Sequence, residues 1–358
     1  MTKEQILATF DPSQPGAAQG QLFGLPFSAD QSEIVVVPAP WEATVSYGSG
    51  ASDGPAAVLE ASYQVDLHHQ KFPDLWKLGI HYDSENAAKW KSDSDRAKEL
   101  AQNVIEALES GKNLADFPEL ESDLAAVNQA SEKFNQEVEN RCAHWLGQNK
   151  LVGFLGGDHA TPYGYYKALA AKFGSFGILH LDAHMDLRIA YEGFSYSHAS
   201  IMYNTVQLPE VEKLVQVGIR DFCEQEVSVA RKHQVVVFTD TDMKEAAFAG
   251  LTWREQSDQI IAELPQRVVI SFDIDGMYPW YCPNTGTPVP GGFSFEQAAY
   301  LLTEVVNSGR ELIGFDLVEV APGDDDWDGN VGARMLFNLC GLLAKANGKA
   351  VGEPIKFQ

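Results

Sequence analysis

Asp182, His184 and Asp186 follow each other at a spacing of two, directly after the apolar run at residues 176–181. That run is typical of a buried strand, and in extended chain residues two apart point to the same face. Buried carboxylates that lie side by side repel each other, and a divalent cation removes this repulsion. The segment therefore predicts a metal site, although a strand end with hydrated carboxylates gives the same pattern.

Two other segments carry similar side chains just after an apolar run. Residues 156–159 read Gly-Gly-Asp-His, and Asp273 and Asp275 follow the run at 268–272. Each segment alone is also typical of a turn. Because ligands of open α/β sheets bind beyond the carboxyl ends of the strands, we expect the segments to converge. Carboxylates and imidazoles without thiolate favour Mn²⁺ over structural zinc, and a ligand set of this size suits two ions bridged by shared carboxylates.

The elements that must position these residues alternate between apolar runs and helical patterns. This alternation predicts an α/β protein with a mostly parallel sheet that helices cover on both faces. The predicted strands cover residues 33–38, 78–80, 151–155, 176–181, 214–218, 235–238, 268–272 and 312–317. One predicted helix begins near residue 54, and the others cover residues 122–149, 162–173, 199–206, 224–233, 253–263, 295–308 and 331–346.

The remaining features of the sequence predict the domain organisation, the excluded partners and the cellular compartment. Residues 1–32 are expected to form a surface arm, residues 33–358 a single domain, and the charged residues 83–122 an insertion or surface excursion. The net charge of −24 argues against nucleic acid and anionic membranes as partners. No apolar run approaches the roughly 20 residues of a membrane span, and no secretory signal is apparent. Four scattered cysteines predict free thiols in a reducing cytoplasm: Cys142, Cys223, Cys282 and Cys340.

The motifs together resemble those of the ureohydrolases, the family of arginase, agmatinase and formimidoylglutamase. They are the segments 156–159, 182–186 and 271–276, and the segment 283–292 adds to the similarity. The resemblance implies an arginase-like three-layer α/β/α fold, a homo-oligomer (trimer or hexamer), residues 33–358 as the catalytic domain, and two Mn²⁺ ions, with Ni²⁺ or Co²⁺ as alternatives. It assigns one ion to His159, Asp182, Asp186 and Asp273, and the other to Asp182, His184, Asp273 and Asp275.

The resemblance also implies the reaction. A metal-bridging hydroxide attacks the guanidinium carbon, Asp275 carries a proton to the leaving amine, and urea and an amine are released. His198 matches a histidine that exchanges protons with bulk water, and Glu319 matches a carboxylate that binds the guanidinium. From the residues alone, His198 could instead cap the following helix, and Glu319 could be a solvated residue at a strand end.

The substrate's other end is left open by the sequence. Arg188 is expected at the rim of the site, where a fixed cation would attract a carboxylate and repel an ammonium group, unless it pairs with Glu192 or another acidic residue. Tyr278 stands where the family usually has aspartate, and the bulky Trp280 and Tyr281 could narrow the pocket. We therefore expect hydrolysis of a guanidino compound, with guanidinobutyrate and guanidine among the candidates. Formimidoylglutamase, which releases formamide, is the alternative enzyme. A non-enzymatic binding subunit is disfavoured because all the ligand positions are intact.

Overall fold

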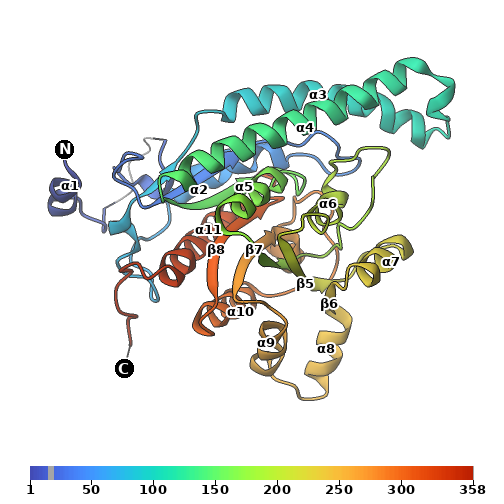
Figure 1. Ribbon diagram of the computed structural model, residues 1–358. Helices are drawn as coiled ribbons and strands as arrows, with labels where there is room; N and C mark the ends of the chain where they lie inside the picture. Colours follow the sequence, from blue (N-terminus) through green and yellow to red (C-terminus); the bar gives the residue numbers. More distant parts are fainter. Residues whose placement is uncertain (15–19, 358) are drawn as a thin grey trace.

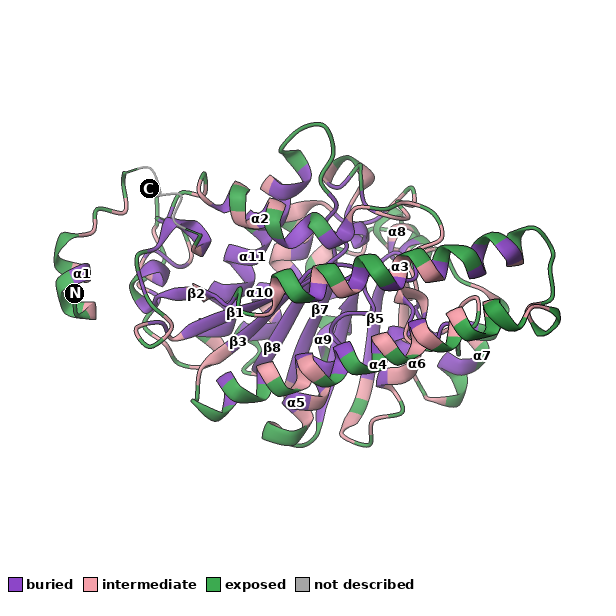
Figure 2. Ribbon diagram, turned by 90° about the horizontal axis from the view of Figure 1, so that it is seen from above, coloured by how far each residue is buried: buried purple, intermediate pink, exposed green. Residues whose placement is uncertain are grey.

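Eight strands, all paired in parallel, form one sheet in the order β2-β1-β3-β8-β7-β4-β5-β6 (Figure 1). The computed structural model describes residues 1–14 and 20–357. The strands are β1 (Ile34–Ala39), β2 (Ile80–Tyr82), β3 (Leu151–Gly156), β4 (Phe176–Leu181), β5 (Val211–Ile219), β6 (Val236–Thr239), β7 (Arg267–Asp273) and β8 (Glu311–Val318). Most of their side chains are buried, because the strands are apolar on both faces (Figure 2).

Helices cover both faces of the sheet, which confirms the predicted three-layer α/β/α architecture. Alternate strand residues point to opposite faces: Ile34 and Val36 pack with one set of helices, whereas Val35 and Val37 pack with the other. The first set is α2 (Gly54–Ser62), α8 (Asp240–Phe248), α9 (Trp253–Ala262), α10 (Phe295–Asn307) and α11 (Trp327–Ala346). The second is α3 (Ala87–Glu109), α4 (Pro118–Gly147), α5 (Tyr163–Phe173), α6 (Ile201–Thr205) and α7 (Glu224–Lys232).

The charged segment 83–122 is more regular than its sequence suggests. Most of it is α3, which forms a hairpin with α4, and the tip of this hairpin extends beyond the sheet (Figure 1). The buried side of α3 carries residues at spacings of seven, four and three, namely Trp90, Ala97, Ala101 and Val104. The outer side of the helix is exposed (Figure 2). The many charges on the outer side hide this stripe of small and apolar residues from a reading of the sequence.

Other boundaries also differ from the prediction. Helix α8 was not predicted, α4 begins at Pro118 rather than at residue 122, and α11 begins at Trp327 rather than at residue 331. Helix α1 (Lys3–Thr9) lies in the predicted arm, of which residues 15–19 fall outside the described residues. The rest of the arm does not simply lie on the surface, because its apolar side chains at 22–27 are buried against the core.

Strand β8 comes last in the sequence but lies in the middle of the sheet, between β3 and β7. The four neighbouring strands β3, β8, β7 and β4 therefore bring their carboxyl ends together, although the segments that follow them are far apart in the chain. Within residues 1–14 and 20–357, no helix combines the length and the apolar character needed to cross a membrane.

Candidate metal centre

The predicted ligands of the first ion converge at the ends of β3, β4 and β7. The Nδ1 atom of His159 lies 3.0 Å from Oδ2 of Asp182, 3.0 Å from Oδ2 of Asp186 and 3.2 Å from Oδ2 of Asp273. All four side chains are buried. Asp186 reaches this position with a left-handed backbone, at a φ of 54°. Such a conformation is uncommon for a residue with a side chain and is often found at functional sites.

The predicted ligands of the second ion lie beside the first group and share Asp182 with it. The Nδ1 atom of His184 lies 3.4 Å from Oδ1 of Asp182 and 3.2 Å from Oδ2 of Asp275. Asp182 therefore presents one carboxylate oxygen to each group, as a bridging ligand would. For Asp273, the other predicted bridging ligand, the side chain lies close to the first group, through its contact with His159.

The chemistry of these donors fits divalent cations. His159 Nδ1 is buried and makes no hydrogen bond within the described part of the chain, although three carboxylate oxygens lie around it. A buried polar atom without a partner is costly, and several negative oxygens at this distance would repel each other without a cation. The donors are all carboxylate oxygens and imidazole nitrogens, which are suitable ligands for Mn²⁺ and similar ions.

Without metal, the site holds extra protons. Burial, followed by the charges of Asp275 and Asp182, raises the pKa of Asp273 well above its ordinary value. Burial disfavours the charged form of His184, but the carboxylates of Asp275 and Asp182 outweigh it and raise its pKa to about 12. A metal ion must therefore displace protons from its ligands when it binds.

This proton displacement predicts the pH dependence of metal binding. The apparent affinity for Mn²⁺ is expected to rise with pH, by about tenfold per pH unit for each displaced proton. Isothermal titration calorimetry between about pH 6 and about pH 8, in buffers that differ in ionisation enthalpy, measures both the affinity and the protons released. An affinity that stays constant, with no proton release, would contradict the proposed ligand set.

A buried row of polar side chains lies across four strands, beneath the ligands. The row consists of residues that are paired in register on neighbouring strands: Gln216 on β5, His180 on β4, Ser271 on β7 and Asp316 on β8. Two members of the row lie two residues before a ligand, His180 before Asp182 and Ser271 before Asp273, so each points to the same face as that ligand. The sequence did not single out these residues. The spacing of His180 could have indicated it, whereas the others become visible only when the strand order is known.

Hydrogen bonds in this row fix the orientation of two ligands. Gln216 Nε2 donates to His180 Nδ1 at 2.9 Å, so the proton of His180 is on Nε2, which donates to Asp182 Oδ2 at 2.7 Å. On the other side, His159 Nε2 contacts Ser271 Oγ at 3.0 Å, and Ser271 donates to Asp316. This bond leaves His159 Nδ1 free to face an ion. Such supporting hydrogen bonds hold the ligand geometry of metal sites.

Arg220 also supports the site and was missed by the sequence interpretation. Its guanidinium donates to the backbone oxygens of Asp275 at 2.6 Å, Val289 at 3.1 Å and Gly218 at 3.0 Å. It thereby joins the end of β5 to the ligand loop after β7 and to the loop at 286–292. No spacing or motif distinguishes this arginine from one on the surface.

A cleft of about 390 Å³ opens over the ligands His184 and Asp186. Its other walls include Arg188, His198 and Tyr47. The predicted narrowing by Trp280 and Tyr281 is wrong: among the described residues neither lines the cleft, and Trp280 is 62% exposed. The ring of Trp280 stacks on that of Tyr278 instead, with ring centroids 4.3 Å apart.

The predicted catalytic residues lie close to the ligands. His198 is half-buried, and burial, followed by the charges of His184 and His159, lowers its pKa to about 4. It is therefore neutral at pH 7. Glu319 is buried rather than solvated, and its Oε1 accepts the backbone N–H of His159 at 2.7 Å. Burial, followed by the charges of Asp273 and Asp158, raises its pKa.

A parallel α/β sheet with two joined carboxylate–imidazole groups at its strand ends is an arrangement that could hold two metal ions for hydrolysis. The family model "Arginase family" matches residues 32–341. The chain is 30% identical over 315 residues to N(1)-aminopropylagmatine ureohydrolase of Thermus thermophilus, covering 87% of this chain and 91% of the relative. It is 27% identical over 303 residues to agmatinase of Bacillus anthracis, covering 84% and 88%. The chain therefore belongs to the arginase family and is a hydrolase.

The solved structures agree on the fold. Proclavaminate amidino hydrolase from Streptomyces clavuligerus superposes with a TM-score of 0.70 at 22% sequence identity, covering 93% of this chain and 100% of that one. Agmatine ureohydrolase of Thermoplasma volcanium gives a TM-score of 0.68 at 19% identity, covering 96% and 99%. These likenesses establish the arginase-like arrangement of the layers.

Proposed function

We propose that this protein is a two-metal ureohydrolase that cleaves a C–N bond of a guanidino compound to give urea and an amine. The observation that supports it most is the pair of ligand groups joined through Asp182 at the floor of a cleft. The names of the relatives, which include agmatinase and aminopropylagmatine ureohydrolase, support a guanidino substrate. Mn²⁺ remains the proposed metal because the ligands are carboxylates and imidazoles.

The side chains around the site have separable roles in this proposal. Two ions held by the six proposed ligands would supply a hydroxide nucleophile at neutral pH. Glu319 orients the planar guanidinium through paired hydrogen bonds. Asp275 carries a proton toward the leaving amine, and His198 lies at the cleft wall, where it exchanges protons with water.

A substrate panel tests the proposal. The Mn²⁺-loaded protein is incubated with arginine, agmatine, aminopropylagmatine, guanidinobutyrate, guanidine and formimidoylglutamate, and urea and formamide are measured. We expect urea from at least one guanidino compound. Formamide from formimidoylglutamate alone would favour the alternative enzyme, and no urea from any guanidino compound would overturn the proposal.

Arg188 supports a substrate with a carboxylate at its far end. Its guanidinium lies over the ring of Tyr191, 4.6 Å from the centroid, and faces the cleft. Its ion-pair partner is an acidic residue other than Glu192, namely Glu226, and the Nε–Oε2 distance is 3.9 Å. Glu226 already accepts two backbone N–H groups, from Leu187 at 3.1 Å and Cys223 at 2.9 Å. Arg188 therefore keeps donors for an anionic substrate group.

Replacing this cation should change substrate preference. We expect Arg188→Met to lower kcat/KM for guanidinobutyrate by about 10- to 100-fold, because a charged hydrogen bond is lost, and to leave agmatine unaffected or improved. Steady-state kinetics with the two substrates measure the difference, and Arg254→Met, an exposed arginine of α9, is the matched control. If both substrates respond equally, the proposed role of Arg188 is wrong.

We further propose a cytoplasmic homo-oligomer, a trimer or hexamer, that works on small molecules without nucleic acid or membrane partners. The four cysteines support a reducing compartment because all are free thiols, and three are buried. Analytical ultracentrifugation measures the assembly.

A further inference from the structure

Two loops form walls of the cleft. Ser46 and Tyr47 come from the loop between β1 and α2, and Arg188, Tyr191 and His198 come from the loop that precedes α6. Neither loop belongs to the sheet, so their positions depend on what holds them. The shape of the cleft, and with it the fit of the substrate, follows from these contacts.

The first loop is held by a buried carboxylate. Glu42 is only 1% exposed; its Oε1 accepts the N–H of Gly50 at 2.9 Å and its Oε2 accepts the hydroxyl of Ser52 at 3.1 Å. Glu42 therefore joins the start of the loop to its end. A buried carboxylate is stable only when it is paired and fully hydrogen-bonded.

Helix α3 supplies the partners of Glu42. Lys98 Nζ lies 3.2 Å from Glu42 Oε2 and donates to Ser49 Oγ at 2.5 Å. One turn earlier on the same helix face, the buried Ser94 Oγ accepts the backbone N–H of Glu42 at 2.8 Å. Two successive turns of α3 therefore hold the loop at Glu42 and at Ser49.

Helix α4 holds the second loop in a similar way. The side-chain amide of Asn128 donates to the backbone oxygen of Gly193 at 3.2 Å and accepts the N–H of Ser195 at 2.8 Å. Between these two residues, Phe194 is buried in an apolar cluster with Val104 and Val127 of the hairpin. Figure 1 shows the loop before α6 reaching up to the hairpin.

We propose that the α3–α4 hairpin fixes both walls of the substrate cleft, with Lys98 and Asn128 as positioning residues. The hairpin contains most of the segment 83–122, to which no motif gave a role. Neither residue contacts a proposed metal ligand, so their loss should loosen the walls and leave the metal centre intact. The kinetic consequence rests on the proposed ureohydrolase function, whereas the effect on loop order does not.

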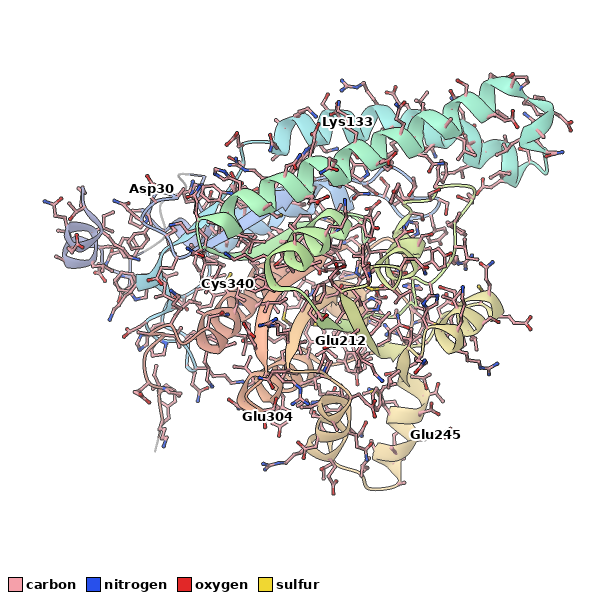
Figure 3. The ribbon with its side chains drawn as sticks, in the orientation of Figure 1. Asp30, Lys133, Glu212, Glu245, Glu304 and Cys340 are labelled. Atoms are coloured by element: carbon pink, nitrogen blue, oxygen red, sulfur yellow. The ribbon has the colours of Figure 1, made fainter. Side chains whose placement is uncertain are left out.

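The two contacts can be tested separately. Lys98→Met keeps the apolar stem and removes the cation, and Asn128→Ala removes the amide of a half-buried residue. Lys133→Met is the matched control, because Lys133 lies on the same hairpin (Figure 3), is 68% exposed and contacts Glu137 only at 4.0 Å. Lys98→Arg tests rescue by a conservative change. Hydrogen exchange of the two loops, bound metal and steady-state kinetics are measured for each variant.

Each variant should act on its own loop. We expect exchange to be about tenfold or more faster at residues 46–53 in Lys98→Met and at 191–196 in Asn128→Ala, with no change in the control. With an active substrate, KM should rise about tenfold while kcat changes less than about threefold and metal content is unchanged. Lys98→Arg should largely restore the first loop.

Unchanged exchange in both loops, or faster exchange spread over the whole chain in both variants, would overturn the proposal. If Lys98→Met alone unfolds, Asn128→Ala decides, because its side chain carries no buried charge. If the wild-type protein releases urea from no substrate, the proposed function fails, and the exchange measurements still decide the role of the hairpin.

Discussion

Asp182→Asn is expected to abolish urea release and to weaken the binding of both ions. Asp182 presents Oδ2 to His159 and Oδ1 to His184, so one substitution removes a charged ligand from both groups. A loss of activity of about 10³-fold or more is expected, since the nucleophile depends on both ions. Urea release and metal content after dialysis, measured by atomic emission, show the two effects together.

The control for Asp182→Asn is Asp258→Asn, which makes the same chemical change at an exposed aspartate of α9 that does not line the cleft. It should retain both ions and the wild-type rate. The shared-ligand arrangement would be wrong if Asp182→Asn also retained two ions and normal activity. A loss of one ion only would show that Asp182 serves a single group.

Glu319→Gln is expected to remove activity while both ions stay bound. The amide keeps the shape of the side chain and can still accept the N–H of His159, but it no longer offers a negative charge to a guanidinium. Losing a buried charge pair with the substrate should lower kcat/KM by about 10²- to 10⁴-fold. Kinetics with the active guanidino substrate and the metal content of the same sample separate this effect from loss of the ions.

Glu311→Gln is the matched control for Glu319→Gln, because Glu311 lies at the opposite end of β8 and pairs with Arg267 at 2.9 Å. It should keep full activity. If Glu319→Gln lost its ions along with its activity, Glu319 would be a support of the metal site rather than a substrate-binding residue.

The layers of the fold were predictable because the strands are continuous apolar runs. Strand β4 has the predicted bounds, 176–181, and β7 extends the predicted 268–272 by one residue at each end. Helix α3 was not predicted, because the small residues on its buried side, such as Ala97 and Ala101, give a weak pattern among many charges. The periodicity of apolar residues therefore predicts an element correctly where large apolar side chains are buried, and it misses a helix that packs through small side chains.

The same distinction applies to the site. Five of the six proposed ligands were visible because they alternate along two strand ends, His159 because it follows a third strand, and the structure brings all six together. The supports Gln216 and Asp316 were not visible, because they act across strands that are neighbours only in the folded sheet. The low pKa of His198 was likewise not visible in the sequence, because it depends on burial and on charges from distant segments.

The central place of β8 has a consequence for the order of events during synthesis. Before residues 311–318 leave the ribosome, the sheet can exist only as two separate halves, β2-β1-β3 and β7-β4-β5-β6. His159 belongs to the first half, and Asp182, His184 and Asp273 belong to the second. The last strand joins the halves, and such long-range pairing forms late because it closes the longest loops. Until β8 joins the two halves, His159 is therefore not held against Asp182 and Asp273, and the proposed two-metal site can be complete only after this last pairing has formed.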